Sequence, residues 1–285
     1  MPSQGEPKST EFMYKLSNKA ENMHQDKFIE LNGIRMHYKE WGNKSDPDVL
    51  LIHGWTSNSE SWTYIAEQIQ DKYHVVAPDH RGHGASTKPV TGYRLRDFVE
   101  DMRQLIDALE LSRPLIAGNS WGGCIGTILA ADYPNSISKA VLGDPVYWKM
   151  LNAFVTRLPG IVERRQSADQ QLAKDLDAQG MTKEQILTKM ESTNNFSLDA
   201  ITRLLSDNRD FAFTCEDYLK RIRIPTLIIA GDAEAGGYIL PEELDHYRRI
   251  VPDMVRITQW PGIGHGVASQ EPDKYVKEML SFFQE

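Results

Sequence analysis

The chain has 285 residues, of which 40% are hydrophobic and 25% are charged. This is the composition of an ordinary globular protein, and it excludes a disordered or fibrous chain. The 40 acidic residues outnumber the 32 basic ones and give a formal net charge of −8, which argues against a general affinity for nucleic acid or anionic membranes. At roughly 150 residues per domain, the length indicates between one and two domains.

The two cysteines, Cys124 and Cys215, are too few for a disulfide framework and lack the spacing of metal ligands. Residues 1–26 form a polar stretch without the apolar centre of a secretory signal. No segment reaches the roughly 18 consecutive apolar residues that would span a membrane. We therefore expect a cytoplasmic protein with a polar N-terminal tail (residues 1–26), no metal and no cofactor.

Short apolar runs alternate with helix-like segments over most of the chain. The Asn32-Gly33 pair between residues 28–31 and 34–38 predicts a β-hairpin. Six further strands are predicted at residues 49–52, 75–77, 115–117, 140–142, 226–230 and 255–258. Uninterrupted apolar strands that alternate with helices, such as residues 95–109, are typical of a parallel sheet covered on both faces. The sequence therefore predicts an α/β fold with a mostly parallel, eight-stranded sheet and an antiparallel hairpin at its edge.

Residues 146–223 interrupt this alternation. They contain no strand signal, only helix-like pieces at residues 166–179, 182–191 and 198–205. A stretch of about 80 residues is too long to be a simple connection in a compact domain. We therefore predict a helical cap at residues 146–223, inserted between two parts of an α/β core at residues 27–145 and 224–285.

The segment Gly118-Asn119-Ser120-Trp121-Gly122 matches the pattern G-x-S-x-G. It follows a predicted strand and opens a predicted helix at residues 123–133, the setting in which such a serine acts as a nucleophile. The tight turn would raise the Ser120 hydroxyl above a helix N-terminus, whose N–H groups favour developing negative charge. The plain alternative is an ordinary glycine-rich turn between a strand and a helix.

A serine hydroxyl needs a base to become a nucleophile at neutral pH. His265 lies in a glycine-rich loop after the last predicted strand, at the sheet edge where Ser120 is expected. Its position also fits the chain order serine, acid, histidine of one class of catalytic triads. We predict that His265 is the base, the alternative being a surface or core histidine without a catalytic role.

Four motifs together resemble the α/β-hydrolase superfamily: His53-Gly54-Trp55, residues 79–86 (DHRGHGAS), residues 118–123 (GNSWGG) and Gly264-His265. They occur in the order found in that superfamily and span residues 28–285. The resemblance implies that Ser120 is the nucleophile, that His265 is the base, and that the backbone N–H groups of Trp55 and Trp121 form the oxyanion hole.

Residues 79–86 allow a second interpretation. Asp79, His80 and His83, together with His53, have the residue types of a metal-binding cluster. The resemblance instead implies a structural loop beside the active site. We adopt the structural interpretation, because no other feature of the sequence supports a metal.

The acid has two candidates. Asp144 follows the predicted strand 140–142, and Glu234 lies in the loop after the predicted strand 226–230, where most relatives carry their acid. The interval from Ser120 to Asp144 resembles a branch that includes several haloalkane dehalogenases and a fungal lactonase. Asp144 is favoured because the acid must be held rigidly: Pro145 braces Asp144, whereas Glu234 lies among glycine and alanine residues.

The residue at position 120 limits the chemistry. Epoxide hydrolases and haloalkane dehalogenases share the His-Gly-Trp signature but need a carboxylate nucleophile, so Ser120 excludes those reactions. The aromatic residues Tyr147, Trp148 and Phe154 predict an apolar substrate pocket, although each could equally belong to the core of the cap. We therefore predict a lactonase-like serine esterase that cleaves a small, largely apolar carboxylic ester or lactone through an acyl-enzyme.

Three other functions remain open. A C–C bond hydrolase could use the same residues on a diketone-like substrate. A cofactor-free dioxygenase or lyase would use the His–acid pair to deprotonate its substrate, and a receptor would keep the pocket but signal to a partner protein. The expected partner is a small apolar substrate rather than nucleic acid or membrane. The oligomeric state is open, with a homodimer as one option.

Overall fold

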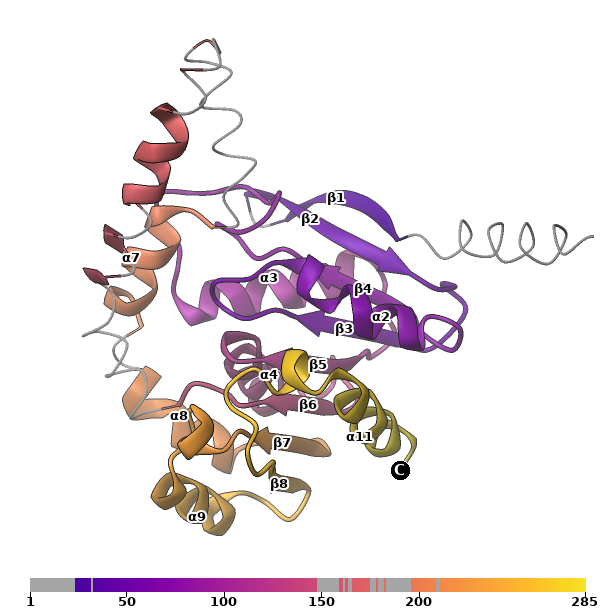
Figure 1. The fold of residues 1–285 in the computed structure, drawn as a ribbon. Coiled ribbons are helices and arrows are strands. Elements are labelled where there is room, and N and C mark those ends of the chain that lie inside the picture. The colour runs from indigo at the N-terminus through magenta and orange to yellow at the C-terminus, as the bar shows by residue number, and fades with distance from the viewer. Residues whose placement is uncertain are drawn as a thin grey trace, which may run out of the picture.

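Eight strands form one sheet that runs through the molecule (Figure 1). The computed structural model describes residues 24–31, 33–147, 159–160, 162–163, 166–174, 178, 182, 196–208 and 211–285. The strands are β1 (Gln25–Leu31), β2 (Ile34–Trp41), β3 (Asp48–Ile52), β4 (His74–Pro78), β5 (Leu115–Asn119), β6 (Ala140–Gly143), β7 (Thr226–Ala230) and β8 (Val255–Gln259).

The strand order in the sheet is β1-β2-β4-β3-β5-β6-β7-β8. Strand β2 is antiparallel to both β1 and β4, whereas every neighbouring pair from β4 to β8 is parallel. At the turn of the hairpin Leu31 pairs with Ile34, and Gly33 has a φ of 74°, which glycine adopts without steric cost. The predicted α/β fold, with its mostly parallel eight-stranded sheet, is confirmed.

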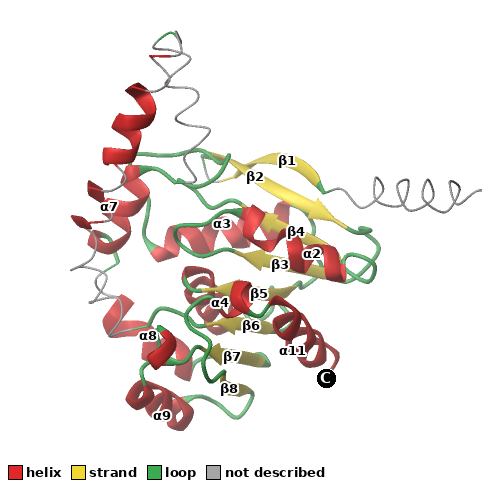
Figure 2. Cartoon of the chain, viewed as in Figure 1, coloured by secondary structure: helices red, strands yellow, loops and turns green. Residues whose placement is uncertain are grey.

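Helices cover both faces of this sheet (Figure 2). In the described part of the chain they are η1 (Ser59–Trp62), α2 (Thr63–Ile69), α3 (Leu95–Ala108), α4 (Trp121–Asp132), α7 (Leu198–Ser206), α8 (Phe211–Lys220), η2 (Ala233–Ala235), α9 (Pro241–Ile250), α10 (Val267–Gln270) and α11 (Pro272–Gln284).

The apolar runs of the strands are explained by burial on both faces. Successive strand residues point to opposite faces, so Leu50 and Ile52 pack in a cluster with α3, α4 and α9, while Val49 and Leu51 pack in a second cluster with α2 and α11. These four side chains are fully buried. A strand that is apolar at every position is therefore required at the centre of this sheet.

Helices α3 and α4 flank the turn that carries Ser120. The apolar residues of α3 recur every three or four positions and form one buried stripe, which is why its predicted bounds nearly match the observed ones. Helix α4 starts at Trp121 instead of Gly123 and is buried along almost its whole length. It therefore begins directly after Ser120, at the carboxyl end of β5.

Within residues 146–223 the described segments contain helices and no strand. Residues 166–174, α7 and α8 are helical, and α8 packs against α4 and α9. The segment before α7 contacts the core: Phe196 forms a β-bridge with His83, and the Ser197 N–H donates to the Gly82 carbonyl over 2.8 Å. Apart from Thr182, the predicted helix at residues 182–191 lies outside the described residues. The extent of the cap remains a prediction.

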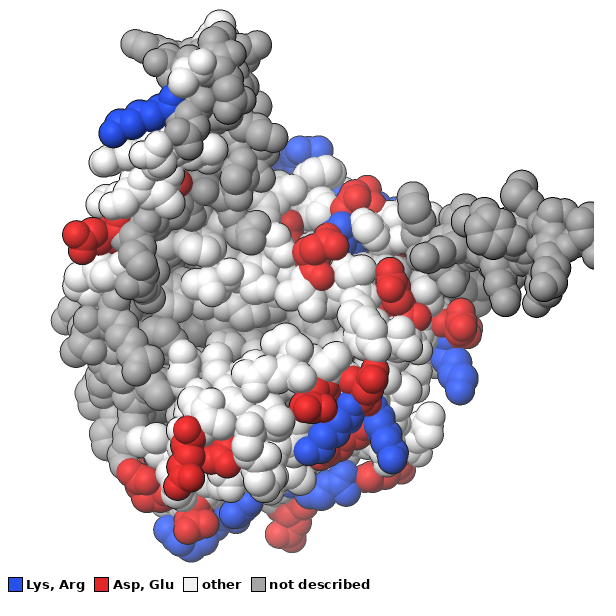
Figure 3. All heavy atoms as spheres, in the orientation of Figure 1, with Lys and Arg blue, Asp and Glu red and all other residues white. Residues whose placement is uncertain are grey.

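Charged side chains of both signs lie side by side along the lower rim of the face drawn in Figure 3, while much of its middle carries neither sign. The acidic side chains of the described residues are therefore not gathered into one patch on that face. Among the helices that the structure describes, none combines the length and the apolar character needed to cross a bilayer.

Candidate active site

Ser120 lies at the sharp turn between β5 and α4. Its φ of 58° is in the left-handed region, which a non-glycine residue adopts only where the surroundings impose it. The Ser120 N–H donates to the Gly143 carbonyl of β6 over 2.8 Å. A Cβ atom on Gly122 would lie 2.1 Å from the Ile52 carbonyl oxygen, and one on Gly118 would lie 2.4 Å from that of Gly122. Both glycines of the motif are thus needed for the turn to close.

His265 lies against Ser120, although the two residues are far apart in the sequence. Its Nε2 atom is 2.7 Å from the Ser120 hydroxyl oxygen. The loop between β8 and α10 carries His265 to this place and is tied down by the Gly264 N–H, which donates to the Gln270 side-chain oxygen over 3.0 Å. The predicted nucleophile and the predicted base are therefore within hydrogen-bonding distance.

Asp144 follows β6 and bonds to the other nitrogen of His265. The His265 Nδ1 atom is 2.7 Å from Asp144 Oδ2. The carboxylate also accepts the backbone N–H groups of Gly231, over 2.9 Å, and Tyr238, over 2.7 Å. Asp144 is fully buried, so these donors replace the water that would otherwise stabilise its charge. With Nδ1–H held by the carboxylate, Nε2 is left to accept the proton of Ser120.

Glu234, the alternative acid, does not contact His265. It is exposed and lies in η2, where its N–H donates to Asp232 Oδ1 over 3.0 Å. Asp232 also accepts the Gly262 N–H over 2.8 Å and so joins this loop to the one that carries His265. The structure brings Asp144, and not Glu234, to the histidine.

The predicted oxyanion hole lies where β3 and β5 end side by side. Gly54 lies against Ser120, since a Cβ atom placed on it would lie 3.3 Å from Ser120 Cβ. The next residue, Trp55, lines the same cavity as Ser120. Trp121 is the first residue of α4, and the N–H groups of a first helical turn have no partner within the helix. Both residues predicted to supply the oxyanion hole therefore belong to segments next to Ser120.

His53 shapes the loop that carries Trp55. Its Nδ1 atom is 2.6 Å from the Gly54 carbonyl oxygen, and its Nε2 atom accepts the His80 N–H over 3.0 Å. Burial lowers the pKa of His53 to about 3, so the imidazole is neutral and its unprotonated Nε2 atom can accept the His80 N–H. The histidine of the His-Gly-Trp motif therefore joins the backbone next to Ser120 to the segment that begins at Asp79.

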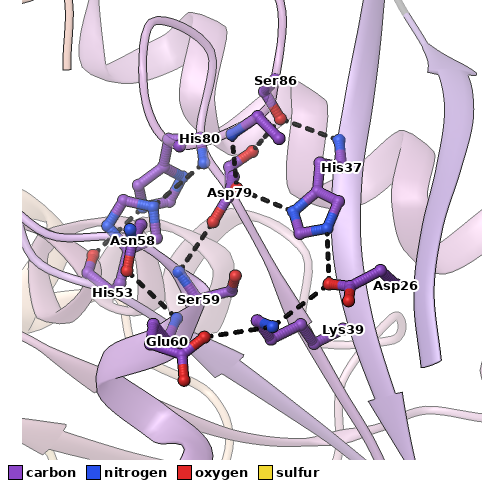
Figure 4. Close-up of polar contacts among 12 residues, drawn as sticks. Asp26, His37, Lys39, His53, Asn58, Ser59, Glu60, Asp79, His80 and Ser86 are labelled. Atoms are coloured by element: carbon purple, nitrogen blue, oxygen red, sulfur yellow. Dashed lines mark hydrogen bonds and ion pairs between the residues drawn. The ribbon is translucent and has the colours of Figure 1, made fainter. Parts of the chain in front are cut away.

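Residues 79–86 form a hydrogen-bonded loop around the buried Asp79 (Figure 4). Asp79 accepts the backbone N–H groups of Ser59, over 2.7 Å, and Ala85, over 2.8 Å, and lies 2.7 Å from His37 Nδ1. Burial alone would raise the pKa of Asp79, but the His37 imidazole and these N–H donors hold it well below its usual range. In the described part of the chain, no three His, Cys, Asp or Glu side chains are grouped as metal ligands.

Replacing Asp79 with asparagine is expected to lower the free energy of unfolding at about pH 7 by about 3 kcal/mol, because an amide cannot accept all three bonds. Since the pKa of Asp79 is lowered on folding, its contribution is complete above the usual carboxyl pKa of about 4 and is lost as the pH falls. Urea denaturation should therefore show the gap between the two proteins narrowing toward about pH 2. Asp253→Asn, at an exposed carboxylate, is the control and should leave the midpoint unchanged. A constant gap at every pH would contradict the assignment.

A cavity of about 330 Å³ opens beside Ser120 and His265. Its lining consists of aromatic, hydroxyl and small residues together with the site itself: His53, Gly54, Trp55, Thr56, Ser57, Ser61, Trp62, Asn119, Ser120, Tyr238, His265, Ala268 and Ser269. No Asp, Glu, Lys or Arg is among these described lining residues. The described part of the lining therefore contributes no carboxylate, ammonium or guanidinium group to the cavity.

None of the three residues predicted to form the pocket is among the described residues that line this cavity. Tyr147 is buried in the core, where its hydroxyl is 2.7 Å from that of Thr127 and its ring packs edge-on against Tyr247. It is not part of the cavity lining. Trp148 and Phe154 lie outside the described residues. The aromatic residues that do line the cavity are Trp55, Trp62 and Tyr238.

Tyr238 was not identified from the sequence. It comes from the loop between η2 and α9, and its ring stacks on His265 with 3.7 Å between ring centroids and 21° between ring planes. Its position after β7 could have indicated it, because a loop that follows this strand emerges at the same sheet edge as Ser120.

Comparisons with known proteins agree with this fold. The model of the family described as the α/β hydrolase fold matches residues 47–213. Human epoxide hydrolase 4 is 30% identical over 133 residues, which are 46% of this chain but only 37% of the human protein. The 2-(acetamidomethylene)succinate hydrolase of Mesorhizobium japonicum is 26% identical over 270 residues, 89% of this chain and 93% of that protein.

A crystal structure of E-2-(acetamidomethylene)succinate hydrolase superimposes with a TM-score of 0.73 at 23% identity and covers 92% of this chain and all of its own. At that identity the likeness concerns the fold alone. The family match, by contrast, covers more than half of the 285 residues and includes the strand, turn and helix around Ser120. The chain therefore belongs to the α/β hydrolase fold family.

Proposed function

We propose that the protein is a serine hydrolase that cleaves a small, uncharged and largely apolar carboxylic ester or lactone. The observation that carries this proposal is the chain of two hydrogen bonds of 2.7 Å from Ser120 through His265 to the buried Asp144. A hydroxyl, an imidazole and a carboxylate in this order form the arrangement that activates serine for acyl transfer.

In the proposed reaction the Ser120 oxygen attacks the carbonyl carbon while its proton passes to His265 Nε2. The carbonyl oxygen becomes an oxyanion, which the N–H groups of Trp55 and Trp121 stabilise. As the tetrahedral intermediate collapses, Nε2 gives the proton to the leaving alkoxide, and an acyl-serine remains. Water then attacks the acyl-serine with the same proton transfers, releasing the acid and restoring Ser120.

Some relatives are named epoxide hydrolases. The family resemblance implies that such enzymes need a carboxylate nucleophile, whereas this chain has Ser120 at the turn between β5 and α4. A serine that has attacked an epoxide would form an ether, which water does not readily hydrolyse. The proposal therefore excludes epoxide turnover, although the sequence similarity to epoxide hydrolases is clear.

The described lining of the cavity supports a neutral substrate, because it contains no Asp, Glu, Lys or Arg. The name of the Mesorhizobium enzyme indicates a dicarboxylate substrate, which needs cationic partners when it is buried. None of the described residues that line this cavity is Lys or Arg. The side chains of Trp55, Trp62 and Tyr238 instead offer apolar surface.

A matched pair of esters tests this function. p-Nitrophenyl butyrate and mono-p-nitrophenyl succinate have acyl chains of equal length but differ by one carboxylate. We expect kcat/KM to be at least about tenfold higher for the neutral ester, because the second carboxylate would be desolvated without a partner. Styrene oxide should not be turned over. Faster cleavage of the succinate would contradict the neutral-substrate proposal, and no cleavage of either ester would contradict the hydrolase.

A further inference from the structure

Tyr238 touches two members of the candidate triad through different parts of the residue. Its backbone N–H donates to Asp144 Oδ2 over 2.7 Å, the same oxygen that binds His265 Nδ1. Its ring lies on the face of the His265 imidazole, with centroids 3.7 Å apart. The residue also lines the cavity. One residue thus contacts the acid, the base and the space where a substrate would bind.

The loop after β7 holds Tyr238 firmly in this place. The Gly237 N–H donates to the Asp232 carbonyl over 2.7 Å, and a Cβ atom on Gly237 would lie 2.5 Å from the Gly231 carbonyl carbon, so the two ends of the loop touch. On the other side of Tyr238, Ile239 is buried in the core. The backbone of Tyr238 is therefore held by contacts of the residues on both sides of it.

The two hydrogen bonds of His265 act at the edge of its ring, at Nδ1 and Nε2, and the covalent bond to Cβ holds a third point. The ring of Tyr238 packs instead on the face of the imidazole, so it opposes tilting of the imidazole plane that would lengthen both hydrogen bonds. The π face of an aromatic ring also attracts a cation within about 6 Å, and an imidazolium forms only when His265 has taken the serine proton.

We propose that Tyr238 is a positioning residue whose ring fixes the plane of the His265 imidazole and stabilises the imidazolium formed during proton transfer. This inference rests on the proposed function, because it concerns the same nucleophile and base. It deepens that function by giving the loop after β7 a role other than supplying the acid.

Two substitutions separate the ring from the rest of the residue. Tyr238→Phe keeps an aromatic face, and Tyr238→Leu keeps apolar bulk without a π system. Both keep the backbone N–H that binds Asp144. With p-nitrophenyl butyrate, we expect the phenylalanine variant to stay within about twofold of the wild type and the leucine variant to lose about tenfold in kcat with little change in KM. The limiting rate at which a fluorophosphonate labels Ser120 should fall by a similar factor in the leucine variant.

Nuclear magnetic resonance provides a readout that needs no turnover. The ring-current shift of the His265 ring protons should persist in Tyr238→Phe and disappear in Tyr238→Leu. An unchanged kcat in the leucine variant, an effect on KM alone, or equal losses in both variants would overturn the proposal. If the wild type neither cleaves esters nor reacts with the fluorophosphonate, the proposed function fails, and loss of the ring-current shift would still establish the stack by itself.

Discussion

Replacing Ser120 with alanine is expected to reduce kcat for p-nitrophenyl butyrate by a factor of at least about 10⁴ and to abolish labelling by a fluorophosphonate. The reason is structural, because the Ser120 oxygen is the atom that lies 2.7 Å from His265 Nε2 at the cavity wall. Without it the histidine has no nucleophile to deprotonate, and the only remaining route is direct attack by water.

The matched control for this variant is Ser61→Ala. Ser61 lines the same cavity, but its hydroxyl donates to the Asn58 carbonyl over 2.8 Å and does not contact His265. Labelling and kcat should stay within about twofold of the wild type. If the natural reaction were an oxygenation or a lyase reaction that uses only the His–acid pair, Ser120→Ala would retain substantial turnover. Retained turnover with the ester would refute the assignment of Ser120.

Asp144→Asn is expected to lower kcat by about 10⁴, whereas Glu234→Gln should leave it unchanged. Asp144 Oδ1 accepts the Gly231 N–H, and Oδ2 accepts both the Tyr238 N–H and His265 Nδ1. An asparagine must place its NH₂ group at one of these positions, where it faces at least one donor. Rotating the amide by 180° cannot avoid this conflict. An NH₂ group that faces His265 also favours the tautomer in which Nδ1 carries no proton.

The same conflict should cost stability, by about 1–3 kcal/mol for a buried donor without a partner. Activity must therefore be compared at equal folded fraction, checked by circular dichroism at the assay temperature. Glu234→Gln makes the same carboxylate-to-amide change on an exposed residue of the alternative loop, so it is a matched control. A large loss in the glutamine variant, with Asp144→Asn near the wild type, would reverse the assignment of the acid.

The outline of the core followed from local patterns. The apolar runs at residues 49–52 and 226–230 could be predicted as strands, because a strand buried on both faces must be apolar at every position. The hairpin could be predicted because Gly33 adopts a positive φ that other residues avoid. Ser120 could be predicted because its turn needs glycines at fixed positions on either side, and these glycines form a recognisable sequence motif.

Local patterns thus predict the sheet, the turn at Ser120 and a histidine after the last strand, because each depends on residues close together in the chain. Which side chains lie against His265 depends on the packing of distant segments. Strands β6 and β7 are neighbours whose carboxyl ends meet at one edge, so the strand pattern admits both Asp144 and Glu234, and the sequence favours Asp144 because Pro145 follows it. Two backbone N–H groups from the loop after β7 converge on Asp144, and the same loop lays Tyr238 on the histidine. Such convergence depends on packing between distant segments, which no local pattern records.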